Sequence, residues 1–433
     1  MKKEFNIGIV GCGTVGSSLV NLILENKEEI QEKIGFTFNI TQICVKNINK
    51  ERGLKIDNKV FTSDISKIID NPEIDIVVEL VGGTTFAKEV IEKSLINGKQ
   101  VVTANKALMA AHGASLFELA KKYKTDIYFE ASVAGAIPIL LPIALSLSGN
   151  KISSIKAILN GTCNYILTKM SEDGKTYENA LTEAQKLGFA EAEPSLDVEG
   201  FDTMHKLVIL ASLGFRTLIT EKDVFVEGIT GITFEDINYA RDFGYVIKLL
   251  GIAKETKNGI ELRVHPAMIP KNHHLATVRN ELNAVSVTGN FSDELIFVGK
   301  GAGGKPTASS VMGDIINVAQ DLNNGQTQEV QLIKMYSQKK KPIIEKEKFV
   351  SEYYIKLNVI DIPGVLGNIS GILGKNKISI GSVIQKERKK INDIVPLVML
   401  THETVEENIL NALKTINELE VVKGNITLIR IEK

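Results

Sequence analysis

Gly11-Cys12-Gly13-Thr14-Val15-Gly16, near the start of the chain, matches the pattern G-x-G-x-x-G. The motif follows an apolar run predicted as a strand, 6–10, and opens a segment whose apolar residues recur at helical spacing. In that context the first glycine permits a tight turn, and the second lets backbone N–H groups approach a pyrophosphate at the helix N-terminus. The third glycine permits close packing of helix on strand. We predict that this loop binds a dinucleotide through Gly11, Gly13, Thr14, Val15 and Gly16.

Short apolar runs alternate with helical segments from residue 5 to residue 129. Such alternation predicts an α/β fold of the Rossmann type, a doubly wound parallel sheet covered by helices on both faces. A further helix, expected at 311–322, could pack back onto this part. We therefore predict a dinucleotide-binding domain over 1–130, completed by 311–335.

The rest of the chain is organised differently. Residues 131–310 mix strands and long helices, which predicts an α+β substrate-binding and dimerisation domain. Residues 336–349, rich in Lys and Glu, are predicted as a solvated linker. Residues 350–433 follow the order strand–helix–strand–strand–helix–strand, which predicts a small ferredoxin-like domain.

The composition excludes several classes of protein. Among 433 residues, 51 Lys and Arg stand against 52 Asp and Glu, so the net charge of −1 provides no field to hold a nucleic acid. No apolar run reaches the ~18–20 residues of a membrane helix. Three widely spaced cysteines argue against a disulfide framework, and no signal peptide is evident, so a cytoplasmic location is expected. No zinc-binding motif is present.

The predicted second strand ends at Val45-Lys46-Asn47. An acidic residue at this point would bind the free ribose 2′-hydroxyl of NAD. Lys46 stands there instead, with Lys50 and Arg52 close behind. A cation can accept a 2′-phosphate, so NADP is favoured, NAD remains possible, and ordinary surface charge is the alternative.

Three further groups of residues are candidates for chemistry. Lys106 follows a parallel strand at the edge where ligands of such sheets bind, and it could hold a carboxylate or move a proton; a solvated loop lysine is the alternative. Asp202 and Lys206 are one helical turn apart. They form a plain ion pair, worth ~0.2–0.5 kcal/mol, or Asp202 joins a carboxylate cluster with Glu191, Glu193, Asp197 and Glu199 that could seat a substrate ammonium group. The glycine-rich segment 299–307 is either a turn or a backbone surface against the cofactor.

Several segments together resemble the homoserine dehydrogenase family, in the form that carries a C-terminal ACT-type regulatory domain. The resemblance covers nearly the whole chain. Its specific parts are VTANKAL at 102–108, FEASVAGAIPI at 129–139, NGTCNYIL at 160–167, GFAEAEP at 188–194, DVEGFD at 197–202 and the loop 299–310.

This resemblance implies NAD(P)H-dependent, reversible reduction of L-aspartate 4-semialdehyde to L-homoserine, in threonine, methionine and isoleucine biosynthesis. It implies that Glu191 and Asp202 bind substrate, that Lys206 donates and accepts the proton, and that Lys106 lies between nicotinamide and substrate. Gly303 is expected to contact the cofactor. Which lysine carries the proton stays open at this point.

The resemblance also implies a monovalent cation, sodium in the family. Its pattern falls on Glu130, Val133, Gly135 and Ile137. Ligation by oxygen alone suits a hard cation. The expected function of the ion is to brace this turn, apart from the reacting atoms.

The segment Asp361-Ile362-Pro363-Gly364 looks like the opening of an ACT module, where helix N–H groups could receive an amino-acid carboxylate. Threonine, the end product, is the expected effector, and a dimerisation module without ligand is the alternative. A homodimer or homotetramer is expected. The rival hypotheses for the whole chain are a non-catalytic amino-acid sensor that retains the dinucleotide-binding fold and a different semialdehyde dehydrogenase.

Overall fold

A computed structural model describes residues 2–325, 340–385 and 394–433. Contacts within the chain divide it into two compact units. The first comprises Met1–Leu159, Asp202–Val224 and Leu282–Lys341, and the second comprises Asn160–Phe201, Phe225–Glu281 and Pro342–Lys433. Within the described ranges, no helix is both long enough and apolar enough to cross a bilayer.

A six-stranded parallel sheet, in the order β3-β2-β1-β4-β5-β6, forms the centre of the first unit. Its strands are β1 (Glu4–Val10), β2 (Thr37–Cys44), β3 (Phe61–Thr62), β4 (Ile76–Glu79), β5 (Gln100–Thr103) and β6 (Ile127–Tyr128). Every residue of β4 and β5 is buried, as expected for strands covered on both faces. Strand β1 pairs in parallel with both β2 and β4, so the strand order reverses beside it. The predicted doubly wound sheet is confirmed, and its switch point lies at the glycine motif.

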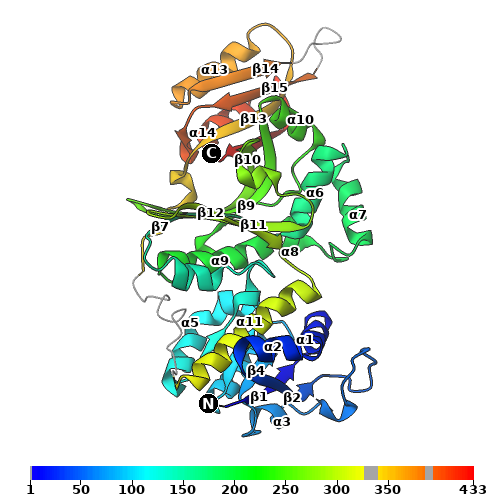
Figure 1. Ribbon diagram of the computed structural model, residues 1–433. Coiled ribbons are helices and arrows are strands. Elements are labelled where there is room, and N and C mark those ends of the chain that lie inside the picture. Colours follow the sequence, from blue (N-terminus) through cyan, green and yellow to red (C-terminus); the bar gives the residue numbers. More distant parts are fainter. Residues whose placement is uncertain (1, 326–339, 386–393) are drawn as a thin grey trace. The chain divides into compact units, whose positions relative to one another are not determined.

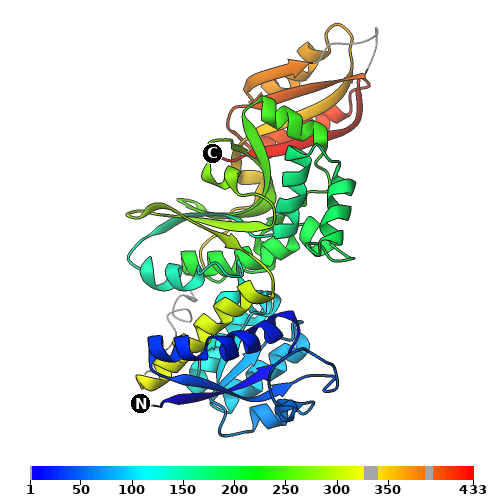
Figure 2. The same cartoon turned by 45° about the vertical axis from the view of Figure 1, so that its right-hand side comes forward.

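Helices cover both faces of this sheet (Figure 1). They are α1 (Thr14–Glu25), α2 (Lys27–Ile34), α3 (Ser66–Ile69), α4 (Thr85–Ile96), α5 (Lys106–Tyr123) and α11 (Gly304–Asn323). Helix α11 comes from far along the chain and packs against α1, as Figures 1 and 2 both show. It begins seven residues before the predicted start at 311, because the glycine-rich loop ends by entering the helix. Residues 326–335 of the predicted first domain lie outside the described residues.

The remainder of the first unit is an antiparallel sheet with one long helix. Strand β11 (Leu282–Gly289) pairs with β7 (Ile152–Ile158) on one side and with β12 (Asp293–Lys300) on the other. Helix α9 (Phe201–Phe215) packs so closely on β7 that a Cβ atom at Gly214 would lie 2.8 Å from Ile155. Short helical turns complete the unit: η1 (Asn58–Val60), η2 (Glu130–Ser132), η3 (Pro142–Ser146) and η4 (Glu221–Asp223).

A long antiparallel hairpin, β9 (Tyr245–Thr256) and β10 (Gly259–Pro270), carries the second unit. The elements that accompany it are α6 (Gly161–Glu172), α7 (Tyr177–Lys186), α8 (Ser195–Val198), β8 (Phe225–Val226), α10 (Phe234–Asp242) and η5 (His274–Thr277). Strands mixed with helices in this part of the chain agree with the α+β class predicted for the middle of the sequence.

The C-terminal part of the second unit has the predicted strand–helix–strand–strand–helix–strand order. Its elements are η6 (Lys346–Lys348), β13 (Val350–Ile360), α13 (Val365–Lys375), β14 (Ile380–Gln385), β15 (Ile394–Thr401), β16 (Thr404–Val405), α14 (Glu406–Asn417) and β17 (Val422–Ile431). Ile355 and Leu357 of β13 pack with Ile369 of α13 and Ile409 of α14 in one apolar core. The ferredoxin-like prediction is confirmed.

The predicted linker is anchored where the structure describes it. The Ile344 N–H donates to the carbonyl of Ile260 on β10, at 2.9 Å. The Lys341 N–H donates to the Thr217 hydroxyl at 3.1 Å. Residues 336–339 of that segment lie outside the described residues. The three domain boundaries expected from the sequence stay a prediction. Each of the two compact units combines separate segments of the chain, so the units do not correspond one to one with the expected domains.

Candidate active site

The glycine motif forms the turn between β1 and α1. Gly11 has a φ of 100°, and a Cβ there would lie 2.7 Å from the Leu80 carbonyl oxygen. A Cβ at Gly16 would lie 2.4 Å from the Gly11 carbonyl oxygen, so this position needs glycine for close packing. Nothing lies within 4 Å of a Cβ at Gly13, and no side chain caps α1. The open approach and the uncapped N–H groups fit the pyrophosphate of a dinucleotide.

The cations predicted to select the cofactor have different surroundings. Lys46 is exposed just beyond β2. The Arg52 guanidinium donates to the carbonyls of Asn47 (2.8 Å) and Lys50 (2.6 Å) and lies over the Phe61 ring. Arg52 therefore braces the loop that carries Lys46.

Two lysines from distant parts of the chain meet at one carboxylate. Lys106 is the first residue of α5, and its Nζ lies 2.7 Å from Oδ1 of Asp202. Nζ of Lys206, one turn along α9, lies 2.7 Å from Oδ2 of the same carboxylate. The Lys206 ammonium also donates to the Leu159 carbonyl at 2.7 Å. Asp202 thus holds both ammonium groups at one point.

Burial gives this cluster its strength. The side chains of Lys206 and Asp202 are 10% and 7% exposed, whereas that of Lys106 is 41% exposed. Burial alone would raise the pKa of Asp202, but the charges of Lys206 and Lys106 hold it well below its ordinary value of 3.8. Asp202 is therefore ionised at neutral pH. A lone surface pair at this spacing would contribute far less.

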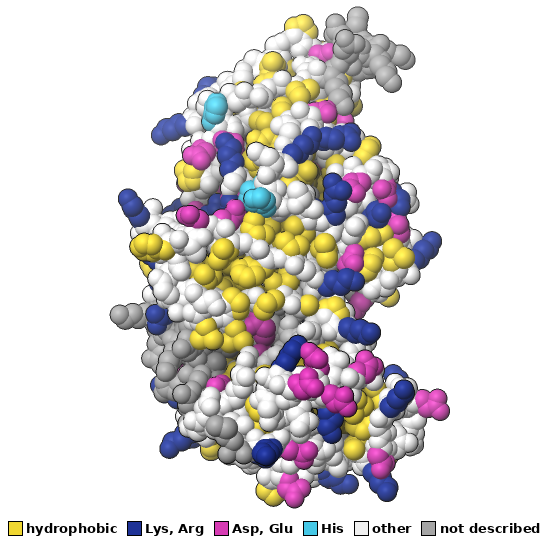
Figure 3. Space-filling view, viewed as in Figure 1, with side chains coloured by type: hydrophobic (Ala, Val, Ile, Leu, Met, Phe, Trp, Pro, Cys, Tyr) yellow, Lys and Arg dark blue, Asp and Glu magenta, His cyan; other side chains and the backbone are white. Residues whose placement is uncertain are grey.

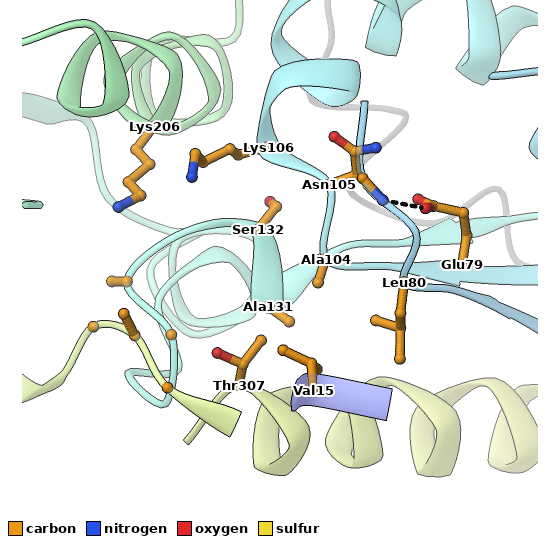
Figure 4. A pocket seen from close by; sticks show the side chains of 16 residues that line it. Val15, Glu79, Leu80, Ala104, Asn105, Lys106, Ala131, Ser132, Lys206 and Thr307 are labelled. Atoms are coloured by element: carbon orange, nitrogen blue, oxygen red, sulfur yellow. Dashed lines mark hydrogen bonds between the residues drawn. The ribbon is translucent and has the colours of Figure 1, made fainter. Parts of the chain in front are cut away.

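A pocket joins the lysines to the glycine loop (Figure 4). Lys106 and Lys206 line one end, and Val15, Glu79 and Leu80 line the other. Ser132 lies between the two ends in Figure 4. One continuous pocket therefore connects Val15 of the glycine loop with both lysines.

The second glycine-rich segment borders this pocket through Gly301, Ala302 and Gly303. Gly303 has a φ of 112° and directly precedes α11. A Cβ at Gly135 would lie 2.5 Å from the Gly301 carbonyl carbon, so two chain segments meet here at backbone distance. Of the two alternatives from the sequence, the surroundings favour a backbone surface along the pocket.

The residues implied for a cation form a tight turn beside the pocket. Both oxygens of the buried Glu130 carboxylate accept backbone N–H groups, from Ile139, Leu140 and Leu141. The carbonyl of Gly135 accepts the Ser310 hydroxyl at 2.7 Å. In the described residues, no group of three His, Cys, Asp or Glu side chains is placed to hold a metal. Val133 and Ile137 are buried in the same turn.

Glu191 belongs to the second unit, where it is exposed in the loop between α7 and α8. Its carbonyl accepts the Gln185 side-chain amide at 3.2 Å. Its place in the site stays a prediction. Sequence reasoning did not find the Leu159 carbonyl or the position of Ser132, since neither carries a motif, and it did not find that Asp202 bridges both lysines.

Comparisons with known proteins agree across the chain. Residues 138–316 match the family model for homoserine dehydrogenase, residues 11–130 match its NAD-binding domain, and residues 353–420 match the ACT domain. Homoserine dehydrogenase from Pseudomonas aeruginosa is 41% identical over 100% of this chain and 99% of its own length. The crystal structure of a homoserine dehydrogenase from Thiobacillus denitrificans superposes with a TM-score of 0.93, at 38% identity, covering 99% of this chain and 98% of that one.

A hyperthermophilic archaeal homoserine dehydrogenase, solved in complex with NADPH, covers 73% of this chain and 98% of its own with a TM-score of 0.62, at 27% identity. The matches run over the whole chain and agree with the uncapped glycine turn and the pocket beside it. The chain therefore belongs to the homoserine dehydrogenase family, NAD(P)-dependent oxidoreductases that act on a CH–OH group.

Proposed function

We propose that the protein reduces L-aspartate 4-semialdehyde to L-homoserine with NADPH, reversibly, in the pathway to threonine, methionine and isoleucine. One observation carries the proposal. Asp202 holds the ammonium groups of Lys106 and Lys206 at 2.7 Å each, in a pocket that the dinucleotide loop also lines. Carbonyl reduction needs a hydride site and a proton donor side by side, and this pocket offers both.

Lys206 is proposed as the proton donor. NADPH, when bound, would supply a hydride for the aldehyde carbon, and the aldehyde oxygen would then need a proton. The Lys206 ammonium gives that oxygen its proton, and the lysine regains a proton from solvent after the alcohol leaves. Burial of Lys206 against the Leu159 carbonyl fixes the position of its Nζ. Lys106 stabilises the negative charge that develops on the oxygen.

Asp202 and Glu191 are proposed to bind the substrate ammonium group. In the structure each oxygen of Asp202 faces a lysine, and Lys106 is the more exposed of the two. A substrate ammonium can therefore take the place of Lys106 at Oδ1 and turn Lys106 toward the reacting oxygen. Buried Lys206 keeps Oδ2.

Selection of NADP over NAD is proposed to rest on Lys46. The loop beyond β2 leaves this ammonium exposed, while Arg52 is bound to backbone carbonyls. A 2′-phosphate adds a charge for Lys46 to pair with, which NAD lacks.

A monovalent cation, sodium, is proposed to bind backbone carbonyls of Val133, Gly135 and Ile137. Glu130 and Asp314 are buried nearby, and no Lys, Arg or His of the described residues is paired with either. Burial and Glu130 raise the pKa of Asp314. Glu130 completes the proposed ligand set, and its carboxylate also accepts the backbone N–H groups of Ile139, Leu140 and Leu141. A melting temperature that is higher in sodium chloride than in tetramethylammonium chloride supports the site, and equal values contradict it.

The ACT-type domain is proposed to bind threonine as a feedback effector, and the chain is proposed to form a homo-oligomer. Hydrophobic side chains gather over β11 and β12 on the face in Figure 3, and Phe291 and Val298 are 86% and 53% exposed. Light scattering on the purified protein tests assembly, and a monomer would contradict it. Turnover assayed with added threonine tests regulation, and unchanged rates would contradict it.

The decisive substitution is Lys206→Ala, with Lys169→Ala as control. Lys169 also faces an aspartate four residues away, Asp173 at the end of α6, but that pair is less buried, with side chains 25% and 40% exposed. We expect Lys206→Ala to abolish reduction of the semialdehyde while NADPH still binds, and the control to keep turnover. Near-normal turnover of Lys206→Ala would refute the role assigned to it, and loss in both variants would point to a folding defect.

A further inference from the structure

A buried carboxylate that the proposed chemistry does not use lies at the other end of the pocket. Glu79 is the last residue of β4 and has no exposed surface. Its oxygens accept the Val81 N–H (2.8 Å), the Gly82 N–H (3.2 Å, dashed in Figure 4) and the Thr103 hydroxyl (2.6 Å). Within the described part of the chain, Glu79 has no ion pair with a lysine, arginine or histidine. Burying a carboxylate without a counter-charge costs free energy, and hydrogen bonds to its oxygens must offset that cost.

The bonds of Glu79 continue into the first turn of α5. The Thr103 hydroxyl, which donates to Glu79, accepts the Asn105 N–H at 3.1 Å. The side-chain oxygen of Asn105 accepts the Leu108 N–H and so caps α5, while its amide donates to the Gly83 carbonyl at 2.7 Å. The loop after β4 and the loop after β5 are thereby joined into one hydrogen-bonded network.

Lys106 directly follows Asn105 and starts α5. We propose that Glu79 is a positioning residue for Lys106: through Thr103 and Asn105 its buried carboxylate fixes the helix start from which Lys106 reaches Asp202. The inference rests on the proposed function, in which Lys106 contacts the reacting oxygen. Lys106 is partly exposed, so packing alone leaves its long side chain several rotamers. A fixed starting point restricts the directions in which its Nζ can lie.

The experiment is a double-mutant cycle between Thr103 and Lys106. Thr103 does not line the pocket, and Thr103→Val keeps its shape while removing the hydroxyl between Glu79 and Asn105. We expect kcat/KM for the semialdehyde to fall about 10- to 100-fold in Thr103→Val, as for a displaced catalytic group. The dissociation constant of NADPH should stay within about twofold, and Thr103→Ser should restore most of the rate, because the hydroxyl returns.

The cycle separates positioning from a general structural effect. If Thr103 acts through Lys106, Thr103→Val should cost little more once Lys106→Ala is present, so the two losses are not additive. Losses that multiply independently would overturn the inference, as would full activity of Thr103→Val. If Lys106→Ala alone is nearly as active as wild type, the proposed role of Lys106 in the reaction is refuted. The proposal that Glu79 positions Lys106 for that reaction is then refuted as well. If Thr103→Val melts at a much lower temperature than wild type, Glu79→Gln takes its place in the same double-mutant cycle with Lys106→Ala.

Discussion

Asp202→Asn removes the charge that Lys106 and Lys206 share while keeping the size of the side chain. The pair with Lys206 is buried on both sides, so its loss leaves a buried ammonium without its counter-charge, at about 3–5 kcal/mol. The pair with Lys106 is partly exposed and screened, so it adds little. At roughly 2 °C per kcal/mol for a unit of this size, the melting temperature should fall by about 6–10 °C. Turnover should fall at least about 100-fold, the range of a lost acid–base arrangement.

The pH dependence of this effect has a defined sign. Burial alone would raise the pKa of Asp202, but Lys206 and Lys106 depress it below the ordinary value of 3.8 that it has in the unfolded chain. A depressed carboxyl pKa contributes stability that is fully present above the ordinary value and is lost as the pH falls through the folded value. The difference in melting temperature between wild type and Asp202→Asn should therefore be constant near neutral pH and shrink at pH values below about 4.

The matched control is Asp173→Asn. Asp173 faces Lys169 at the same four-residue spacing and 3.1 Å, but the side chains of Lys169 and Asp173 are 25% and 40% exposed. Its loss should leave the melting temperature nearly unchanged, because solvent screens such pairs. Equal shifts in the two variants, or an Asp202→Asn protein that melts and turns over like wild type, would refute the argument from burial.

Three further outcomes are expected. Gly16→Ala, whose new Cβ would meet the Gly11 carbonyl, should lose NADPH binding measured by fluorescence titration; retained affinity would show that the turn can open. Lys46→Ala should raise KM for NADPH more than for NADH, and equal changes would make the cation ordinary surface charge. Removal of residues 350–433 should end any response to threonine while leaving turnover, but it also uncovers β10 and takes Glu432 from the buried Arg263, so thermal unfolding should broaden or shift downward. An unfolded, inactive remainder would show that the C-terminal part is needed for folding.

Local pattern was enough to predict the elements of the fold. The glycine motif between an apolar run and a helical segment predicted the β1–α1 turn, because Gly11 and Gly16 each meet a local steric demand there. The C-terminal order of strands and helices was likewise readable from apolar periodicity. The start of α11 at Gly304 was not, since glycine disfavours helix and the loop around it sets the helix start.

The candidate site could be predicted only in part. The one-turn spacing of Asp202 and Lys206 indicates a pair on one helix face, but nothing in that spacing brings Lys106 to the same carboxylate. That meeting depends on tertiary packing of segments about a hundred residues apart. The Leu159 carbonyl and the Glu79–Thr103–Asn105 network were missed for the same reason: backbone acceptors and hydrogen bonds across strands leave no periodic signal in a sequence.

The most direct test of the proposed semialdehyde reduction follows the absorbance of NADPH in the presence of the purified full chain. L-aspartate 4-semialdehyde is added last. If Lys106 and Lys206 act together beside the dinucleotide loop, the protein should oxidise NADPH only after the aldehyde is added. The amount of homoserine formed should equal the amount of NADPH oxidised. Tight NADPH binding with no consumption at any concentration of the aldehyde would contradict this account.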